Sequence, residues 1–301
     1  MRKENVFVIG DGMIQIFDTF EDFKSVFKDN LNLSIEEKIE LWEKGYISKY
    51  PELEAKCKGD YVDSGYDWRE IATTLVFNRT RDDFDKMMEA YNNILKVIDD
   101  INNKVKQVFQ MELDINIVLY CGLCNSAGWV TTYNGKRAIL FGIDKMAELN
   151  WHTMEKVQPL IAHELCHVIH FELRGEDDLN IDIERSNYNK GIWRIYEEGF
   201  AQFYQQKLLD KDIDSRGREW EDKCAANIDK LKKLYLEALS DEEKGSKEFF
   251  GDWFQVMGIS DVGYFLGAQL IKKINEELKV DHIAKLEFKE IEQNVIKFLK
   301  S

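Results

Sequence analysis

The sequence predicts a mostly helical α+β fold with one small mixed sheet. Only two prolines interrupt the 301 residues, so long helices can form. In several long segments the apolar residues recur at steps of three and four, as on one face of a helix. A few short stretches are instead rich in β-branched residues and lie beside Asp-Gly or Asn-Gly pairs, which indicates hairpins.

The chain is long enough to bury a large core in one domain or in two smaller ones. We expect a mostly helical N-terminal region over residues 1–110 and a core with the sheet over residues 111–210. A C-terminal helical region over residues 211–301 should pack against that core. No repeat or low-complexity linker separates these regions, so they can also form one compact unit.

Local signals in the N-terminal region favour a hairpin followed by helices. Residues 5–17 alternate around an Asp-Gly turn. Ser34 and Glu37 have the spacing of a capping box, which predicts a helix start. The clearest helix is expected to be capped by Thr80 and to keep an apolar stripe as far as Phe109, about 45 Å at 1.5 Å per residue.

The core region begins with predicted strands. Residues 114–120 have the length and β-branching of a buried strand. Residues 128–132 and 137–141 flank Asn134 and Gly135, a strong hairpin signal. The sheet should therefore be complete just before the apolar helix that carries the histidines.

Composition restricts the classes of partner. The chain has 41 Lys and Arg against 56 Asp and Glu, a formal charge of -15. This charge argues against nucleic acid or an anionic membrane as a partner and favours a monomer that repels its own copies. No signal-peptide core and no uncharged stretch of membrane-spanning length is visible. The five scattered cysteines suggest a reducing compartment, so a cytoplasmic protein is expected.

Three of the five histidines lie in one apolar segment, which contains His-Glu-x-x-His. On a helix His163 and His167 lie about 40° apart and one turn apart, so both imidazoles can reach one ion. His170 is on the same stripe but about 10.5 Å from His163 along the axis. One ion cannot bind both, so a third ligand must come from elsewhere.

The chemistry of this segment points to zinc. Glu164 is offset from the histidines by about 100°, where it can take a proton from a metal-bound water. A catalytic zinc ion has three protein ligands and one open position, and it lowers the pKa of its bound water to about 7. Burying two histidines and a glutamate in a helix without a partner would cost folding free energy. An accidental match to a short pattern is the alternative, but we predict one zinc ion per chain.

The motif at residues 163–167 is followed by Glu-Glu-Gly-Phe-Ala at residues 197–201. This pairing resembles the gluzincin zinc metallopeptidases, most closely the aminopeptidase N group, and families of predicted bacterial zinc proteases have a similar one. The resemblance covers about a quarter of the chain, residues 114–206. It implies a zincin core of the thermolysin-like type and hydrolysis of peptide bonds in peptide or protein substrates.

The resemblance also implies roles for single residues. It makes His163 and His167 zinc ligands, Glu198 the third ligand and Glu164 the general base. Glu197 is a rival third ligand, but the Gly-Phe-Ala that follows favours Glu198. The gap of thirty residues between His167 and Glu198 is longer than in the aminopeptidase N group, and the insert is expected to form part of the cleft wall.

Relatives in these families place a tyrosine from a later helix near the oxyanion of the tetrahedral intermediate. Tyr264 resembles that tyrosine in placement, although an ordinary core tyrosine is an equally good interpretation. His282 is a weaker candidate for the same role. A phenol aimed at developing negative charge would stabilise the transition state.

In gluzincins an edge strand just before the active helix pairs with the substrate backbone. Ile139, Leu140, Phe141 and Gly142 occupy that place here and are the expected substrate-binding strand. The Gly-x-Met-Glu-Asn motif that reads a free amine in the aminopeptidase N group is absent. Endopeptidase and exopeptidase action therefore both remain open.

Two other interpretations compete with a peptidase. Cys121 and Cys124 form a Cys-x-x-Cys pair that could be a redox site or half of a structural zinc site. The protein could also be a non-catalytic module that binds a peptide on a peptidase scaffold. The presence of every part of a working site favours the enzyme.

Overall fold

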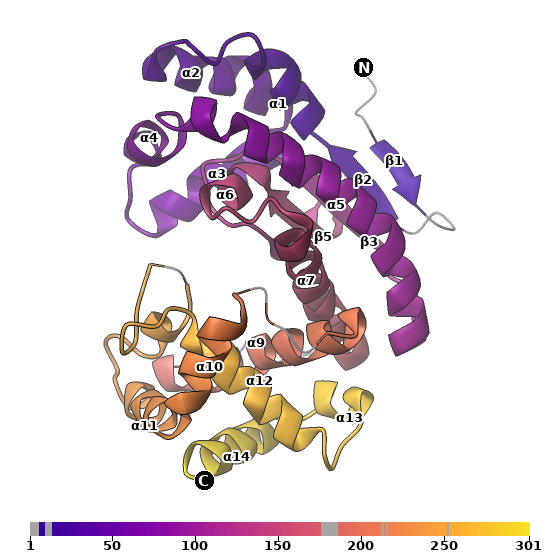
Figure 1. Cartoon of the computed structure of the whole chain (residues 1–301), viewed down its shortest axis with the longest axis vertical. Helices are drawn as coiled ribbons and strands as arrows, with labels where there is room; N and C mark the ends of the chain where they lie inside the picture. The colour runs from indigo at the N-terminus through magenta and orange to yellow at the C-terminus, as the bar shows by residue number, and fades with distance from the viewer. Residues whose placement is uncertain (1–5, 10–13, 176–185, 212–213, 215, 252) are drawn as a thin grey trace. The chain divides into compact units, whose positions relative to one another are not determined.

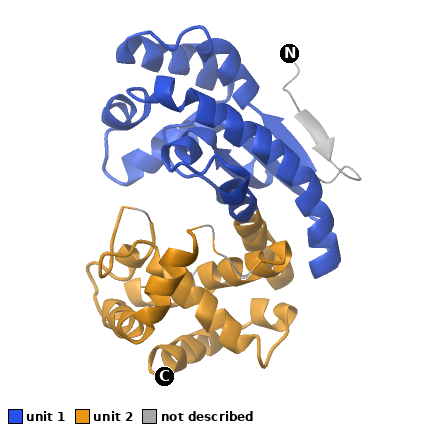
Figure 2. Ribbon diagram, in the orientation of Figure 1, with its two compact units in different colours: residues 1–161 blue, residues 162–301 orange. Residues whose placement is uncertain are grey.

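The protein is mostly helical and contains one small mixed sheet, so the predicted α+β class is confirmed (Figure 1). The chain divides into two compact units, residues 1–161 and 162–301 (Figure 2). The boundary falls inside one helix, where the apolar face remains continuous and sequence composition gives no signal. The computed structural model describes residues 6–9, 14–175, 186–211, 214, 216–251 and 253–301.

The sheet belongs to unit 1 and has the order β1-β2-β3-β5-β4. Strands β2, β3 and β5 run parallel, while β1 and β4 are antiparallel to their neighbours and form the two edges. Both predicted hairpins are present, although the turn expected at residues 10–12 lies outside the described residues. The strands are β1 (Val6–Ile9), β2 (Ile14–Asp18), β3 (Ile115–Tyr120), β4 (Trp129–Tyr133) and β5 (Lys136–Gly142).

The hairpin of β4 and β5 shows why the sequence signal was reliable. Tyr133 pairs with Lys136, which leaves a two-residue loop. Asn134 and Gly135 have φ angles of 50° and 70°. A type I′ turn needs positive φ at both positions, and Asn-Gly tolerates this best.

Strand β5 is internal, so the prediction that residues 139–142 form an edge strand was wrong. Leu140 pairs with Val118 on one side and with Trp129 on the other. The Asn-Gly turn folds β4 back along β5 and covers that edge. All four residues are buried, and β4 is the edge strand in their place.

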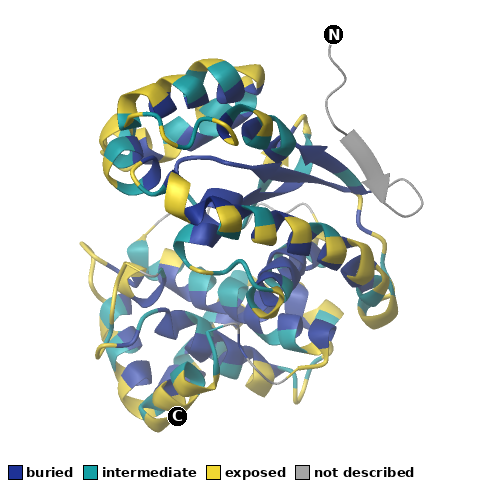
Figure 3. Cartoon of the chain, turned by 45° about the horizontal axis from the view of Figure 1, so that its top comes forward, coloured by how far each residue is buried: buried dark blue, intermediate teal, exposed yellow. Residues whose placement is uncertain are grey.

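Helices cover the sheet within unit 1, and the described strands of the sheet are largely buried (Figure 3). The core of this unit is rich in aromatic side chains. The capping box of Ser34 and Glu37 is present. Thr80 is the first residue of α5 instead of its cap, and its hydroxyl donates to the carbonyl of Val76. The helices are α1 (Phe20–Phe27), α2 (Ile35–Leu41), η1 (Trp42–Tyr46), η2 (Ile47–Lys49), α3 (Pro51–Asp63), α4 (Trp68–Ile71), η3 (Ala72–Val76), α5 (Thr80–Phe109) and α6 (Ile143–Glu148).

Helix α7 (Met154–Arg174) runs from unit 1 into unit 2 and ends at Gly175, whose φ of +84° suits a residue that follows a helix. Among the described residues, no helix is both long and apolar enough to cross a lipid bilayer. The other helices of unit 2 are α9 (Asn187–Leu209), α10 (Arg218–Ala226), α11 (Ile228–Leu239), η4 (Lys247–Phe249), α12 (Val262–Ile274), α13 (Val280–Ala284) and α14 (Phe288–Leu299).

Helices α9 and α12 cross at unusually short range within unit 2. A Cβ atom added to Gly199 would lie 2.4 Å from the backbone carbonyl of Gly267. Two glycines at the crossing therefore let the backbones touch. This contact sets the position of the α12 side chains relative to those of α9.

Candidate metal centre

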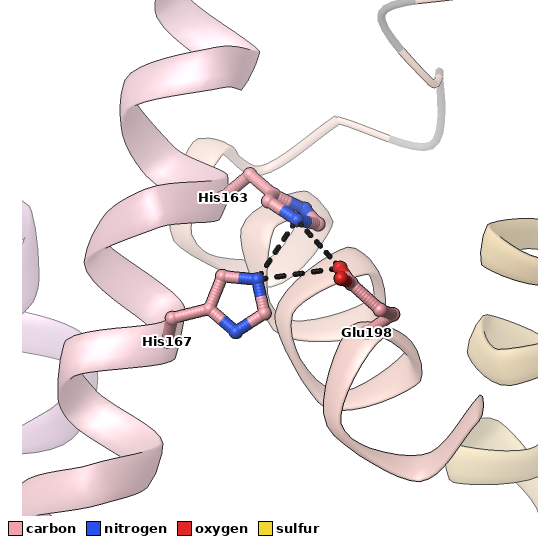
Figure 4. Close-up of side chains that lie close together, drawn as sticks. All are labelled: His163, His167 and Glu198. Carbon is pink, nitrogen blue, oxygen red and sulfur yellow. Dashed lines mark hydrogen bonds and ion pairs between the residues drawn. The ribbon is translucent and has the colours of Figure 1, made fainter. Parts of the chain in front are cut away.

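Helices α7 and α9 bring together the three predicted ligands (Figure 4). Nε2 of His163 lies 3.1 Å from Nε2 of His167, as expected for one helical turn. Each of these nitrogens lies 3.3 Å from Oε2 of Glu198. The three donor atoms thus form a nearly equilateral triangle from two helices that are remote in sequence.

The triangle has the dimensions that a zinc ion requires. Zinc bonds to nitrogen and carboxylate oxygen are about 2.0–2.2 Å, so two ligand atoms of a tetrahedral site lie about 3.3–3.6 Å apart. The observed separations of 3.1 and 3.3 Å are close to this range. Two imidazoles and one carboxylate are also the donor set of many catalytic zinc sites, and they leave a fourth position open.

The structure separates the two adjacent glutamates. Glu198 faces both histidines, whereas the Oε2 atom of Glu197 accepts a hydrogen bond of 2.9 Å from Nε1 of Trp193. Neighbouring helical residues point about 100° apart, so only one of the pair can face α7. The downstream Gly-Phe-Ala had favoured Glu198 for the same place.

The pKa values of the two histidines are shifted in opposite directions. Burial lowers the pKa of His163, and the charges of His167 and Arg216 act in the same direction. Burial also disfavours charge on His167, but its hydrogen bond to Glu198 and nearby carboxylates outweigh this and raise its pKa to about 9. The two histidines hold the pKa of Glu198 well below its usual range despite its burial.

Glu164 is buried beside the triad, with 6% of its surface exposed. Burial raises the pKa of its carboxyl to about 7, and the negative charge of Glu198 adds to the rise. The charge of His167 opposes it. A carboxyl with this pKa can both accept and return a proton near neutral pH.

Tyr264 lies against the triad, as its predicted role requires. Its ring centroid is 5.7 Å from that of His163, in an edge-to-face arrangement. Burial raises the pKa of its phenol, so the group remains a hydrogen-bond donor. The rival His282 is on α13, where its side chain is 67% exposed and 3.9 Å from Asp281. The structure therefore brings Tyr264 to the histidines and leaves His282 at the surface.

Arg216 supports Tyr264 and was missed by the sequence analysis. Its guanidinium carbon lies 4.3 Å from the Tyr264 ring centroid. Nε donates to Asp261 at 3.0 Å and Nη1 to Asp214 at 3.2 Å, so two carboxylates balance the cation. Gln202 on α9 is buried and donates to the same Asp214. No sequence motif marks this network, because its members come from two loops and a helix.

His170 is too far from the triad to belong to it, as its spacing from His163 predicted. It has a structural role instead. Its Nε2 atom lies 3.1 Å from the hydroxyl of Tyr196, which in turn donates to the carbonyl of Ile283. The imidazole also packs at 4.5 Å from the ring of Phe200. These contacts connect α7, α9 and α13. Burial lowers the pKa of His170 to about 3, so the group is neutral.

The two cysteine interpretations find no support. All five cysteines are free and buried, and none belongs to a converging group of metal donors among the described residues. Burial raises the pKa of Cys121 and Cys124 well above the usual value, which disfavours the reactive thiolate.

The insert expected to form a cleft wall falls mostly on residues 176–185, outside the described residues.

Two histidines and a carboxylate on α7 and α9, with a buried glutamate beside them, place the protein in the class with a candidate metal site of the zinc-enzyme type. The comparison with protein families agrees with this class. The chain belongs to the family described as "Putative zinc dependent peptidase (DUF5700)", whose model matches residues 21–299. No curated protein and no solved structure matches the chain.

Proposed function

We propose that the protein is a zinc metallopeptidase of the gluzincin type that hydrolyses peptide bonds in peptide or protein substrates. His163, His167 and Glu198 would hold one zinc ion, in a core of the thermolysin-like kind. The observation that carries the proposal is the triangle of donor atoms at 3.1 to 3.3 Å, in a chain of a zinc peptidase family.

The residues around the triad have distinct tasks in this reaction. A bound zinc ion would polarise the scissile carbonyl and acidify a water molecule. Glu164 takes the proton of the attacking water and returns it to the leaving amine. Tyr264 donates its phenolic hydrogen to the oxyanion that develops on the carbonyl. Arg216, whose guanidinium carbon lies 4.3 Å from the ring centroid of Tyr264, keeps that phenol oriented.

The substitution Glu164→Gln tests the general base. We expect it to retain one zinc per chain, measured by elemental analysis, because Glu164 is not a member of the donor triangle. Cleavage of a mixed peptide library, read by mass spectrometry, should fall by about 10²–10⁴-fold, the usual contribution of a general base.

Two results would contradict the proposal. Retained turnover in Glu164→Gln would remove Glu164 from the mechanism. A wild-type protein that holds one zinc and cleaves nothing in the library would instead be a binding module. His282→Ala, at an exposed position on α13, is the matched control and should cleave as wild type does.

A further inference from the structure

Arg194 is the one described arginine of unit 2 that lacks an oxygen partner among the described residues. It is half-buried on α9, and its contact is with the ring of Phe250, whose centroid lies 4.6 Å from the guanidinium carbon. The other described arginines of the unit have oxygen partners. Arg174 donates to the carbonyls of Ala284 and Leu286, Arg216 pairs with Asp214 and Asp261, and the exposed Arg218 lies 3.9 Å from Oε2 of Glu221.

The guanidinium of Arg194 can bind a ligand. It has five N–H donors in one plane, and none of them bonds to an oxygen of a described residue. The guanidinium lies over the ring of Phe250, a contact that uses none of its N–H donors. The N–H groups of an arginine match the two oxygens of a carboxylate, which they can bind through two parallel hydrogen bonds.

Arg194 is close to the metal centre. It precedes Glu198 by one helical turn, about 6 Å along the axis and about 40° around it. The Phe250 ring on which it stacks is in edge-to-face contact with Tyr264 at 5.4 Å, and Tyr264 contacts His163 at 5.7 Å. An extended peptide advances about 3.3–3.6 Å per residue, so it covers this offset in about two residues.

Arg194 is a positively charged side chain close to several acidic side chains. Glu164, Glu197 and Glu198 surround the histidines, while two carboxylates already balance the neighbouring Arg216. Burial raises the pKa values of Glu197 and Tyr264, and the Arg194 cation opposes both rises, so its field reaches the site. Beside the positive charge that a bound zinc ion would add, Arg194 is the cation near this site that no described carboxylate neutralises.

We propose that Arg194 binds a carboxylate of the substrate, so that the site selects peptides with a negative charge one or two residues from the scissile bond. That carboxylate is either the C-terminus of the peptide or the side chain of an aspartate or glutamate. Arg194 is then a specificity residue, and this inference rests on the proposed peptidase function.

Three N-acetylated peptides of one parent sequence distinguish the two sources of carboxylate. The first ends in a free acid, the second in an amide, and the third is the amide with glutamine replaced by glutamate near the cleaved bond. We expect wild-type protein to prefer the first or the third over the second. Preference for the first identifies the C-terminus, and preference for the third identifies an acidic side chain.

Substitution at Arg194 should remove this preference. In Arg194→Gln we expect KM for the preferred charged peptide to rise about tenfold or more, the loss of a charge-assisted bidentate contact, with little change in kcat. The uncharged amide should be unaffected. Arg194→Lys, which keeps the charge without the planar fork, should recover part of the effect.

Lys207→Gln is the matched control. Lys207 is also a cation of α9 stacked on an aromatic ring, 4.8 Å from that of Phe203, but it lies more than two turns beyond Glu198. This substitution should leave KM unchanged for all three peptides. Equal thermal unfolding of the two glutamine variants would show that both fold.

A binding measurement separates this inference from the proposed function. Calorimetry with zinc-loaded Glu164→Gln should show the charged peptide binding tighter than the amide, and Arg194→Gln in the same background should abolish the difference. Equal affinity for charged and uncharged peptides overturns the role of Arg194, whether or not wild type cleaves them. Absence of cleavage with a retained difference in affinity overturns the peptidase and keeps the carboxylate site.

Discussion

At the scale of single residues, the triad is a proton-linked site. The metal-free protein keeps His167 protonated at pH 8, because its pKa is raised to about 9, whereas His163 is neutral. Zinc binds only the deprotonated imidazole. We therefore predict that zinc binding at pH 8 releases about one proton per ion from His167, in addition to the one that the zinc-bound water loses because its pKa is about 7; calorimetry in buffers of different ionisation enthalpy measures the total.

The same titration in Glu164→Gln isolates the contribution of the histidine. Proton release should persist there, since Glu198 remains the main partner of His167. Release of only the proton of the zinc-bound water would mean that both histidines are neutral before the metal binds.

His170 should make the fold sensitive to acid. Burial lowers its pKa to about 3 in the folded protein, against about 6.5 in the unfolded chain. The unfolded chain thus binds a proton first, so stability is complete above pH 6.5 and falls as the pH drops toward 3. This linkage corresponds to about 2 kcal/mol at pH 5.

The variant His170→Phe has no imidazole at this position, so it lacks this dependence of folding stability on pH. Unfolding by urea at pH 8 and pH 5 should show that the stability of the variant relative to wild type improves on acidification by about 2 kcal/mol. An unchanged difference between the two pH values would show that His170 does not titrate in this way. The other groups titrate in both proteins and cancel in the comparison.

At the scale of elements, the crossing of α9 and α12 holds the site together. Gly199 follows Glu198 directly, and Gly267 lies one turn after Tyr264, so the glycine contact aligns both functional side chains. The glycine of Glu-Gly-Phe-Ala is thus explained by close packing of two helices.

The substitution Gly199→Ala should destabilise the protein. The new Cβ would lie 2.4 Å from backbone atoms of Gly267, which cannot rotate away as a side chain can. Overpacking of this kind costs about 1–3 kcal/mol, visible as a lower midpoint of thermal unfolding. Peptidase activity should fall further, since Tyr264 moves with α12.

Gly59→Ala provides the opposite control. Gly59 is inside α3, and nothing lies within 4 Å of the Cβ that alanine would add. The same substitution should there stabilise the protein by about 0.5–1 kcal/mol, because alanine favours a helix over glycine. Equal effects at both positions would contradict the packing argument.

At the scale of the whole molecule, the site belongs to one of the two units. His163, His167 and Glu198 all lie within residues 162–301, as do Tyr264 and Arg194. A ligand that binds only the folded state stabilises it by about 2.7 kcal/mol at a concentration of 100 times its Kd. The stabilisation of the folded state by zinc should therefore be strongest in unit 2.

Hydrogen exchange with and without zinc measures this distribution. We predict slower exchange in α9, α12 and residues 162–174 of α7 when zinc is added, with little change in β2, β3 and β5. The variant His167→Ala should lose the effect. Equal protection of the sheet would show that the two units open as one cooperative structure.

Local patterns account for what the sequence determined by itself. The spacing of His163 and His167, the Asn-Gly hairpin and the capping box each depend on a few adjacent residues with one preferred geometry. Helical periodicity places both histidines on one face before any tertiary contact forms. The α+β class and most helices and strands followed from the same local rules.

Tertiary structure decided everything that depends on contacts between distant segments. It turned Glu198 and not Glu197 toward the histidines, and it placed Tyr264 beside them. It covered the edge of β5 with β4 and left Arg194 without an oxygen partner among the described residues. Such outcomes depend on how whole helices and strands pack, through contacts like the glycine crossing, and no short stretch of sequence contains that information.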